Sequence, residues 1–176
     1  MISLDDRDAN AMFCLVLDAT VCPINRPSNN RVQRTYYSGK HKQHCIKYEI
    51  GVHPDTGRLV WVSGGVEGSV HDMRLMYLGQ LLQGILPNEL ILADKGYIGN
   101  WQIITPFRRP YTSPVEEVLS RALSSRRIIV EHVLQRFKTF YCLNTKWRHC
   151  KELHCFVFCI IAEIINIDMQ FCLMRQ

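Results

Sequence analysis

The sequence lacks the features that would send a protein into or across a membrane. Its first residues contain neither the basic segment nor the apolar segment of a secretion signal, so no signal peptide is predicted. The longest apolar run, 155–167, is interrupted by Glu163 and is too short to span a bilayer comfortably. We therefore expect no membrane partner.

Two common binding motifs are also missing. Glycines 64, 65 and 68 form a glycine-rich stretch, but no Gly-Lys-Ser/Thr follows it, which disfavours a nucleotide-binding P-loop. Cysteines and histidines gather near the C-terminus without the paired Cys-x₂-Cys spacing of zinc fingers, so a zinc site is disfavoured too. The residues in question are Cys142, His149, Cys150, His154, Cys155 and Cys159.

The composition is that of an ordinary globular protein. The 176 residues are 47% hydrophobic and 21% charged, without internal repeats, low-complexity segments or linkers, which predicts one domain covering 1–176. The net charge of +5 is compatible with nucleic acid as a partner. Several of the eight cysteines lie in apolar runs, so we expect reduced thiols in the cytosol or nucleus.

The apolar patterning predicts a mixed α/β domain with helices packed on a sheet. Strands are expected at 13–17, 45–52, 59–62, 90–93 and 103–105, and helices at 70–83, 115–141 and 151–171. Segments 26–44 and 64–68 are expected to be loops, with Ser69 as a candidate helix cap.

Four acidic residues stand in distinctive local sequences. Asp18 and Asp94 each follow a short apolar run, Asp72 lies at the start of a predicted helix, and Glu131 lies within one. Carboxylates that come from separate elements to one place can bind hard divalent cations. Because Asp18 and Asp94 are both predicted to end buried strands, we expect them to meet at one edge of a sheet.

Spacing alone leaves other interpretations open. Any single aspartate of this kind can be a cap or turn residue, and Glu131 with Arg127 and Lys138 could form a surface strip of ion pairs. The same helix face could equally offer a metal-binding carboxylate between cations that contact phosphates. His71, beside Asp72, could act as a general base, support a ligand, or make a structural hydrogen bond.

Four stretches together resemble the DDE-type transposase domain of the PIF/Harbinger superfamily, which includes Harbinger-derived nucleases. They read DATVCPINRPS, YYSGKHKQHCIKYEIGVHPDTGRLVWVSGGVEGSVHD, LILADKGYIGNWQIITPF and RALSSRRIIVEHVLQRFK. The first motif commonly reads Asp-Gly-Thr in this family, whereas here Ala19 replaces the glycine and the carboxylate is kept.

The resemblance implies an RNase H-like fold and a DNA endonuclease that hydrolyses phosphodiester bonds with two Mg²⁺ or Mn²⁺ ions. By motif, the metal ligands and catalytic residues would be Asp18, Asp72, Asp94 and Glu131. Which of Asp72 and Asp94 is the second catalytic acid stays open. The alternative is a domesticated or truncated domain that binds DNA or a protein without cutting.

The resemblance also implies partners and a location. We expect DNA phosphates to contact Lys40, Lys42, Arg127 and Lys138. The DNA-recognition region that precedes the first catalytic strand in this family is expected to be absent here, and a Myb-like DNA-binding protein could supply that function. The nucleus, with the cytoplasm as a second compartment, is the expected location.

Overall fold

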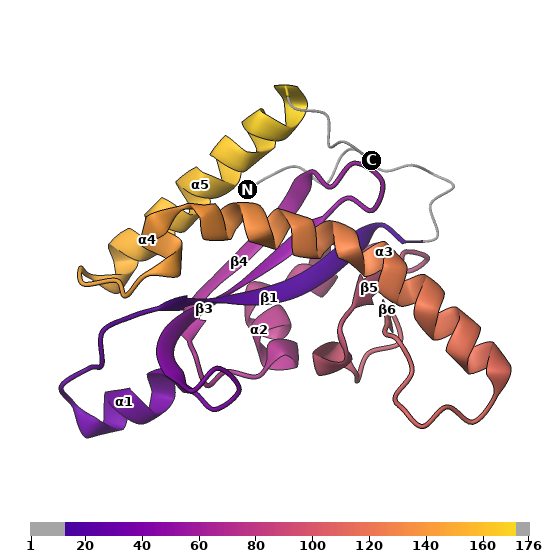
Figure 1. The fold of residues 1–176 in the computed structure, drawn as a ribbon, viewed down its shortest axis with the longest axis horizontal. Coiled ribbons are helices and arrows are strands. Elements are labelled where there is room, and N and C mark those ends of the chain that lie inside the picture. The colour runs from indigo at the N-terminus through magenta and orange to yellow at the C-terminus, as the bar shows by residue number, and fades with distance from the viewer. Residues whose placement is uncertain (1–12, 172–176) are drawn as a thin grey trace.

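The computed structural model describes residues 13–171. They form six strands, five α-helices and two 3-10 turns, which surround one central sheet (Figure 1). In chain order the elements are β1 (Leu15–Pro23), α1 (Asn30–Tyr36), β2 (Tyr37–Ser38), β3 (Gln43–Val52), β4 (Leu59–Glu67), α2 (Asp72–Gly79), η1 (Leu81–Gly84), β5 (Ile91–Ala93), η2 (Lys95–Tyr97), β6 (Ile103–Ile104), α3 (Pro114–Thr139), α4 (Tyr141–Asn144) and α5 (Lys151–Phe171).

The sheet is mixed, with β1 at its centre. β1 pairs with β3 in antiparallel fashion and with β5 in parallel, and β6 extends the parallel half. β2 and β4 both pair with β3 in antiparallel fashion. Three long antiparallel strands followed by two short parallel ones are compatible with an RNase H-like fold, so the predicted fold class is confirmed.

Helices cover both faces of the sheet. α3 and α5 lie on one face and α2 on the other (Figure 1). Alternate residues of β1 divide between two apolar clusters: Val16 packs with Val130 of α3 and Phe158 of α5, whereas Leu17 packs with Met76 of α2. The even-numbered residues of this part of β1 therefore face α3, and this alternation decides where Asp18 points.

β1 does not end at Asp18, as predicted, but continues to Pro23. The prediction assumed that a charge stops a buried strand. Here the Asp18 carboxylate accepts a hydrogen bond from the backbone N–H of Ala19 and a second from Arg127, so its charge is compensated inside the strand. Thr20 and Val21 are buried beyond it and continue the pairing with β3.

Segment 26–44, predicted to be a loop, contains α1 and β2. Asn29 caps α1, because its side chain accepts hydrogen bonds from the backbone N–H groups of Arg31 and Val32. The loop predicted at 64–68 is also wrong, since β4 continues to Glu67. Gly64 lies at a shift in the β3–β4 register with φ of 123°, a conformation that glycine adopts most readily.

The helix predicted at 70–83 is shorter in the structure. α2 begins at Asp72 and ends where Gln80 adopts a left-handed conformation, after which η1 continues the segment. Ser69 does not cap it; His71 occupies the cap position without a side-chain bond. The long predicted helix at 115–141 is confirmed as α3 followed by α4, and the last helix has the predicted bounds.

Candidate active site

Asp18 and Asp94 lie side by side on neighbouring parallel strands. The register pairs Leu17 of β1 with Ala93 of β5; Asp18 is the next residue of β1, and Asp94 directly follows the end of β5. Because Val16 and Leu92 belong to the apolar cluster under α3, residues two positions further along point to the same face. Both carboxylates therefore face α3, and the predicted meeting of Asp18 and Asp94 is confirmed.

Arg127 of α3 lies between these two carboxylates. Its Nη2 is 3.2 Å from Asp18 Oδ2 and its Nη1 is 3.5 Å from Asp94 Oδ1. The arginine side chain is mostly buried, whereas Asp94 is the most accessible of the three. One guanidinium thus compensates two acids, which leaves a net negative charge at the end of β5.

Burial raises the pKa of Asp18 above the ordinary value for an aspartate. The positive charge of Arg127 and the N–H of Ala19 act in the opposite direction, and the neighbouring Asp94 raises the pKa further. Asp18 is thus a carboxylate whose negative charge is incompletely stabilised. A second cation close to it would relieve that cost.

Glu131 lies one helical turn beyond Arg127 on α3. The helix contacts β1 at two points: Arg127 pairs with Asp18, and the Lys138 ammonium donates to the backbone carbonyl of Val21. Glu131 occupies the same helical face between those points, at positions i+4 and i−7. It is exposed and makes no ion pair within residues 13–171, so the structure shows no surface ion-pair strip.

Asp72 makes a different contact. Its Oδ1 accepts a hydrogen bond from Lys47 Nζ at 3.0 Å, and the same ammonium donates to the Val70 carbonyl at 2.6 Å. Asp72 Oδ2 lies against Gly96, where a Cβ would approach it to 2.5 Å. Asp72 and Asp94 line one pocket, but Asp72 is held by its own cation, Lys47, and not by Arg127.

The four predicted phosphate contacts fall into two groups. Lys40 is exposed, lines the pocket with Asp72 and Asp94, and lowers the pKa of Asp18. Lys42 is exposed in the turn before β3, where its φ is 52°. Arg127, in contrast, pairs with Asp18 and Asp94, and Lys138 donates a hydrogen bond to the Val21 carbonyl.

The carboxylates fit a divalent cation in part. Asp18 and Asp94 offer oxygen ligands, which Mg²⁺ and Mn²⁺ prefer, and their mutual repulsion favours a shared cation. Arg127 supplies the positive charge between them here. Within residues 13–171, no group of three or more acids, cysteines or histidines is placed to hold a metal ion.

The C-terminal cysteines and histidines form no metal centre within the described segment. His154 is buried, and its Nδ1 lies 2.7 Å from the hydroxyl of Tyr48, whose ring stacks on Phe158. Burial lowers the pKa of His154 to about 4, so it is a neutral core residue at physiological pH. No disulfide joins the cysteines of residues 13–171.

Comparisons with known proteins show the family of the chain. Residues 17–167 match the family described as DDE superfamily endonuclease. The chain belongs to that family. It is also 31% identical over 164 residues to a protein of Microchaete diplosiphon called "Probable transposase for insertion sequence element IS702". That match covers 88% of this chain and 57% of the relative, so the chain spans little more than half of the relative's length. No solved structure matches the chain significantly.

This member of the DDE family also holds two charged residues that the sequence interpretation missed. Lys47 and Glu49 alternate on β3 and face α2, away from Arg127. Glu49 is fully buried, and its Oε2 accepts a hydrogen bond from Trp61 Nε1 at 3.0 Å. Glu49 Oε1 and the hydroxyl of Tyr97 have no partner with hydrogen-bond geometry, although each group affects the pKa of the other.

Burial raises the pKa of Glu49 to about 7, while Trp61 and Tyr97 lower it and Asp72 raises it. Two charged residues inside the apolar run Cys-Ile-Lys-Tyr-Glu-Ile were a signal that could have revealed this cluster. Charges two residues apart in a strand share a face, so they indicate a buried polar site there.

Among residues 13–171, no helix is both long and apolar enough to cross a membrane.

Proposed function

We propose that this chain is a divalent-metal-dependent DNA endonuclease whose reacting carboxylates are Asp18, Asp94 and Glu131. One observation carries the proposal. Asp18 and Asp94 are adjacent on parallel strands and share a single arginine, which comes from the same face of α3 as Glu131. In this proposal, acids from three separate elements act together beside the end of β5.

Asp18 and Asp94 would hold Mg²⁺ or Mn²⁺, with Glu131 as a further ligand. Bound there as a pair, such cations would activate a water or a DNA 3′-hydroxyl and stabilise the leaving oxygen of an in-line displacement. The N–H of Ala19, 2.8 Å from Asp18 Oδ1, keeps that carboxylate oriented. Before a cation binds, Arg127 compensates the charge of both acids. When the cation displaces it, the Arg127 guanidinium can contact a phosphate oxygen.

Asp72 has a supporting role in this proposal. Lys47 and the Gly96 backbone fix its carboxylate, and no cation is shared between Asp72 and Asp18 among the described residues. The second catalytic acid is therefore assigned to Asp94. Asp72 shapes the wall of the pocket in which Lys40 can reach a phosphate beside Asp94.

The test combines metal binding with cleavage on the same samples. Mn²⁺ is titrated calorimetrically into the parent and into Asp18→Asn and Glu131→Gln, and nicking of supercoiled plasmid is followed in parallel. We expect metal binding and nicking in the parent and the loss of both in Asp18→Asn. Glu131→Gln is expected to weaken metal binding and to abolish nicking, because Glu131 lies one helical turn from Arg127, which contacts both aspartates.

A DNA-binding domain that does not cut is the second candidate. The observation that favours it is Arg127, which occupies the place of a cation between the two acids. If the folded parent binds neither Mn²⁺ nor Mg²⁺ and leaves plasmid intact while binding duplex DNA, this second function replaces the first. Metal binding without cutting would instead indicate an enzyme that needs an additional DNA-recognition partner.

The PIF/Harbinger subtype, a Myb-like DNA-binding partner and a nuclear location are finer parts of the same proposal. The four motif stretches given above support the subtype. In this proposal residues 1–176 are a single catalytic domain that depends on a partner to recognise a DNA sequence. Alone, the domain would then nick plasmid DNA without sequence preference. Mapping the nicks, with and without a purified Myb-like protein, tests this; fluorescence microscopy of a tagged chain tests the location.

A further inference from the structure

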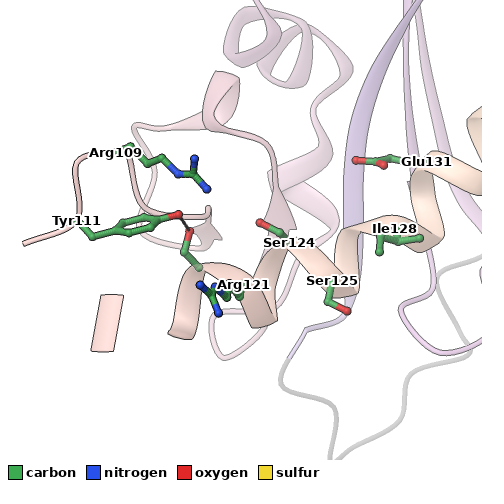
Figure 2. Close-up of a pocket in the computed structure, with 8 residues that line it drawn as sticks. Arg109, Tyr111, Arg121, Ser124, Ser125, Ile128 and Glu131 are labelled. Carbon is green, nitrogen blue, oxygen red and sulfur yellow. Dashed lines mark hydrogen bonds between the residues drawn. The ribbon is translucent and has the colours of Figure 1, made fainter. Parts of the chain in front are cut away.

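A groove beside the acids has a composition suited to phosphates. It lies between the loop that precedes α3 and residues 120–131 of that helix (Figure 2). We call it the α3 groove; its lining residues are Arg109, Tyr111, Ser120, Arg121, Ser124, Ser125, Ile128 and Glu131. Two guanidinium groups and four hydroxyls line it, and Glu131 is the only acid among the lining residues.

One wall of the groove is ordered by polar contacts. The Tyr111 hydroxyl donates to Ser120 Oγ at 3.4 Å, and Ser120 is almost fully buried. The Arg109 guanidinium lies over the Tyr111 ring, 5.8 Å from its centre. Arg109 thus covers one face of the Tyr111 ring and interacts with its hydroxyl, and the rest of its exposed guanidinium is accessible to a phosphate.

The other wall belongs to α3 and leads to the acids. Ser124 and Glu131 are seven residues apart and so share a helical face, and Arg127 contacts Asp18 and Asp94 from the turn between them. Arg121 is ten residues from Glu131, or about 15 Å along the helix. Its ion pair with Glu117 is exposed, so that a stronger anion can displace it easily.

We propose that the α3 groove binds the backbone phosphates of the DNA strand next to the bond that is cut, through Arg109 and Arg121. This inference rests on the proposed endonuclease function and adds the path of the substrate. The 15 Å between Arg121 and Glu131 corresponds to about four phosphates of one B-DNA strand. Arginine and hydroxyl contacts to phosphates position a duplex without reading its sequence.

The first experiment measures DNA binding without cleavage. Fluorescence anisotropy with a labelled duplex, in EDTA, gives the dissociation constant at several salt concentrations for the parent and for Arg109→Gln combined with Arg121→Gln. Loss of two phosphate contacts should reduce the slope of log K against log salt by about 1.8. The control, Lys146→Gln with Arg148→Gln, removes the same charge from exposed residues between α4 and α5, and should leave the slope nearly unchanged.

A second experiment locates the contact on the DNA. Single neutral methylphosphonate linkages are placed one to six phosphates from the cut bond, and binding is measured with the parent and the groove variant. We expect neutral linkages about two to five phosphates from the cut bond to weaken DNA binding by the parent. The same linkages should have little additional effect on DNA binding by the groove variant. Circular dichroism melts of all variants check that these exposed substitutions leave the fold intact.

The outcomes separate this inference from the proposed function. If the parent nicks DNA but both double variants change the salt slope equally, the groove assignment is wrong and the endonuclease stands. If the groove variant alone reduces the slope and its linkage effects are non-additive, the groove is the phosphate path, whether or not the parent cuts. Failure of the parent to bind duplex DNA at low salt would overturn the groove assignment together with the substrate.

Discussion

Two clusters of charge lie on opposite faces of the sheet, and each has two acids and one base. Asp18 and Asp94 share Arg127 on the face under α3, whereas Asp72 and Glu49 lie near Lys47 on the face under α2. In the first cluster the base contacts both acids. In the second, Lys47 binds Asp72 and the Val70 carbonyl, and Glu49 is left with Trp61.

This difference separates an exchangeable site from a closed one. Asp94 is more than one-third exposed, and under the proposed function a metal ion would replace Arg127 there. The second cluster is more buried, and its hydrogen bonds hold Lys47 in place. Equal numbers of charges therefore serve different ends: the first cluster is suited to chemistry, the second to supporting the walls around it.

The largest expected effect distinguishes the acids of the two clusters. Asp94→Asn should reduce plasmid nicking by more than about 100-fold, beyond the range typical of residues that only support a metal ligand. Asp72→Asn should cost about 10-fold or less, because its carboxylate binds Lys47. Initial rates with Mn²⁺ check both variants at equal protein concentration. The reverse order of the two losses would assign Asp72 as the second catalytic acid.

Breaking the Lys47–Asp72 pair of the closed cluster should lower the stability of the protein. Lys47→Met leaves the Asp72 carboxylate, whose side chain is 17% exposed, without its partner. We expect a loss of about 3 kcal/mol in the free energy of unfolding, measured by urea denaturation. Lys42→Met, in the exposed turn before β3, is the control and should change stability by less than about 0.5 kcal/mol.

The double variant Lys47→Met with Asp72→Asn sharpens this result. Removing the second charge should recover part of the lost stability, because the cost arises from an unpaired acid. Lys47→Met as stable as the parent would mean that the pair contributes nothing and that its wall is held by apolar packing.

The pH dependence of stability tests Glu49. Its pKa is about 7 in the folded protein and 4.5 when unperturbed, so the folded state binds a proton that the unfolded state has released between these values. The contribution of Glu49 to the free energy of unfolding is fully present below pH 4.5 and is lost as the pH rises to about 7. The total change is about 3 kcal/mol for a shift of this size.

Glu49→Gln removes that dependence. The variant should match the parent near pH 4 and exceed it by up to about 3 kcal/mol at pH 8, because an amide can keep the bond to Trp61 without a buried charge. Urea denaturation at both pH values measures the difference, with the exposed Glu152→Gln on α5 as control. A constant difference across this range would show that Glu49 does not titrate there.

Periodicity predicted the long elements of this fold well. The apolar spacing of α3 and α5 extends over many turns, and the predicted bounds agree with the structure within two residues. The failures lie where a specific side-chain contact overrides the pattern: Arg127 lets β1 continue through Asp18, and the Asn29 cap forms α1 in a polar segment. Sequence spacing carries no information on these long-range or capping contacts.

The candidate site was predicted in its acids but not in its pairing. Motif and strand order brought Asp18 and Asp94 together correctly, although β1 continues past Asp18, because the parallel register pairs Leu17 with Ala93. Spacing could not distinguish Asp72 from Asp94, since their different cations, Lys47 and Arg127, are 25 and 33 residues away in sequence. That distinction requires the folded sheet.

The smallest expected effect concerns the exchangeable cluster without metal. The pKa of Asp18 is raised in the folded state, so the stability linked to its protonated form is present below its unfolded value and is lost as the pH rises. Asp18→Asn should therefore melt slightly above the parent at pH 7, by no more than about 4 °C, and should match it at pH 3. Circular dichroism melts in EDTA measure this difference.

Mn²⁺ should reverse the order of the melting temperatures of the parent and Asp18→Asn. A cation that binds only the folded state raises the melting temperature in proportion to the logarithm of its concentration, so the parent should gain stability and Asp18→Asn should not. Asp72→Asn, which changes the closed cluster, should keep the gain. If metal stabilises the parent and Asp18→Asn equally, the cation binds elsewhere, and the two clusters do not differ in the way that their pairing indicates.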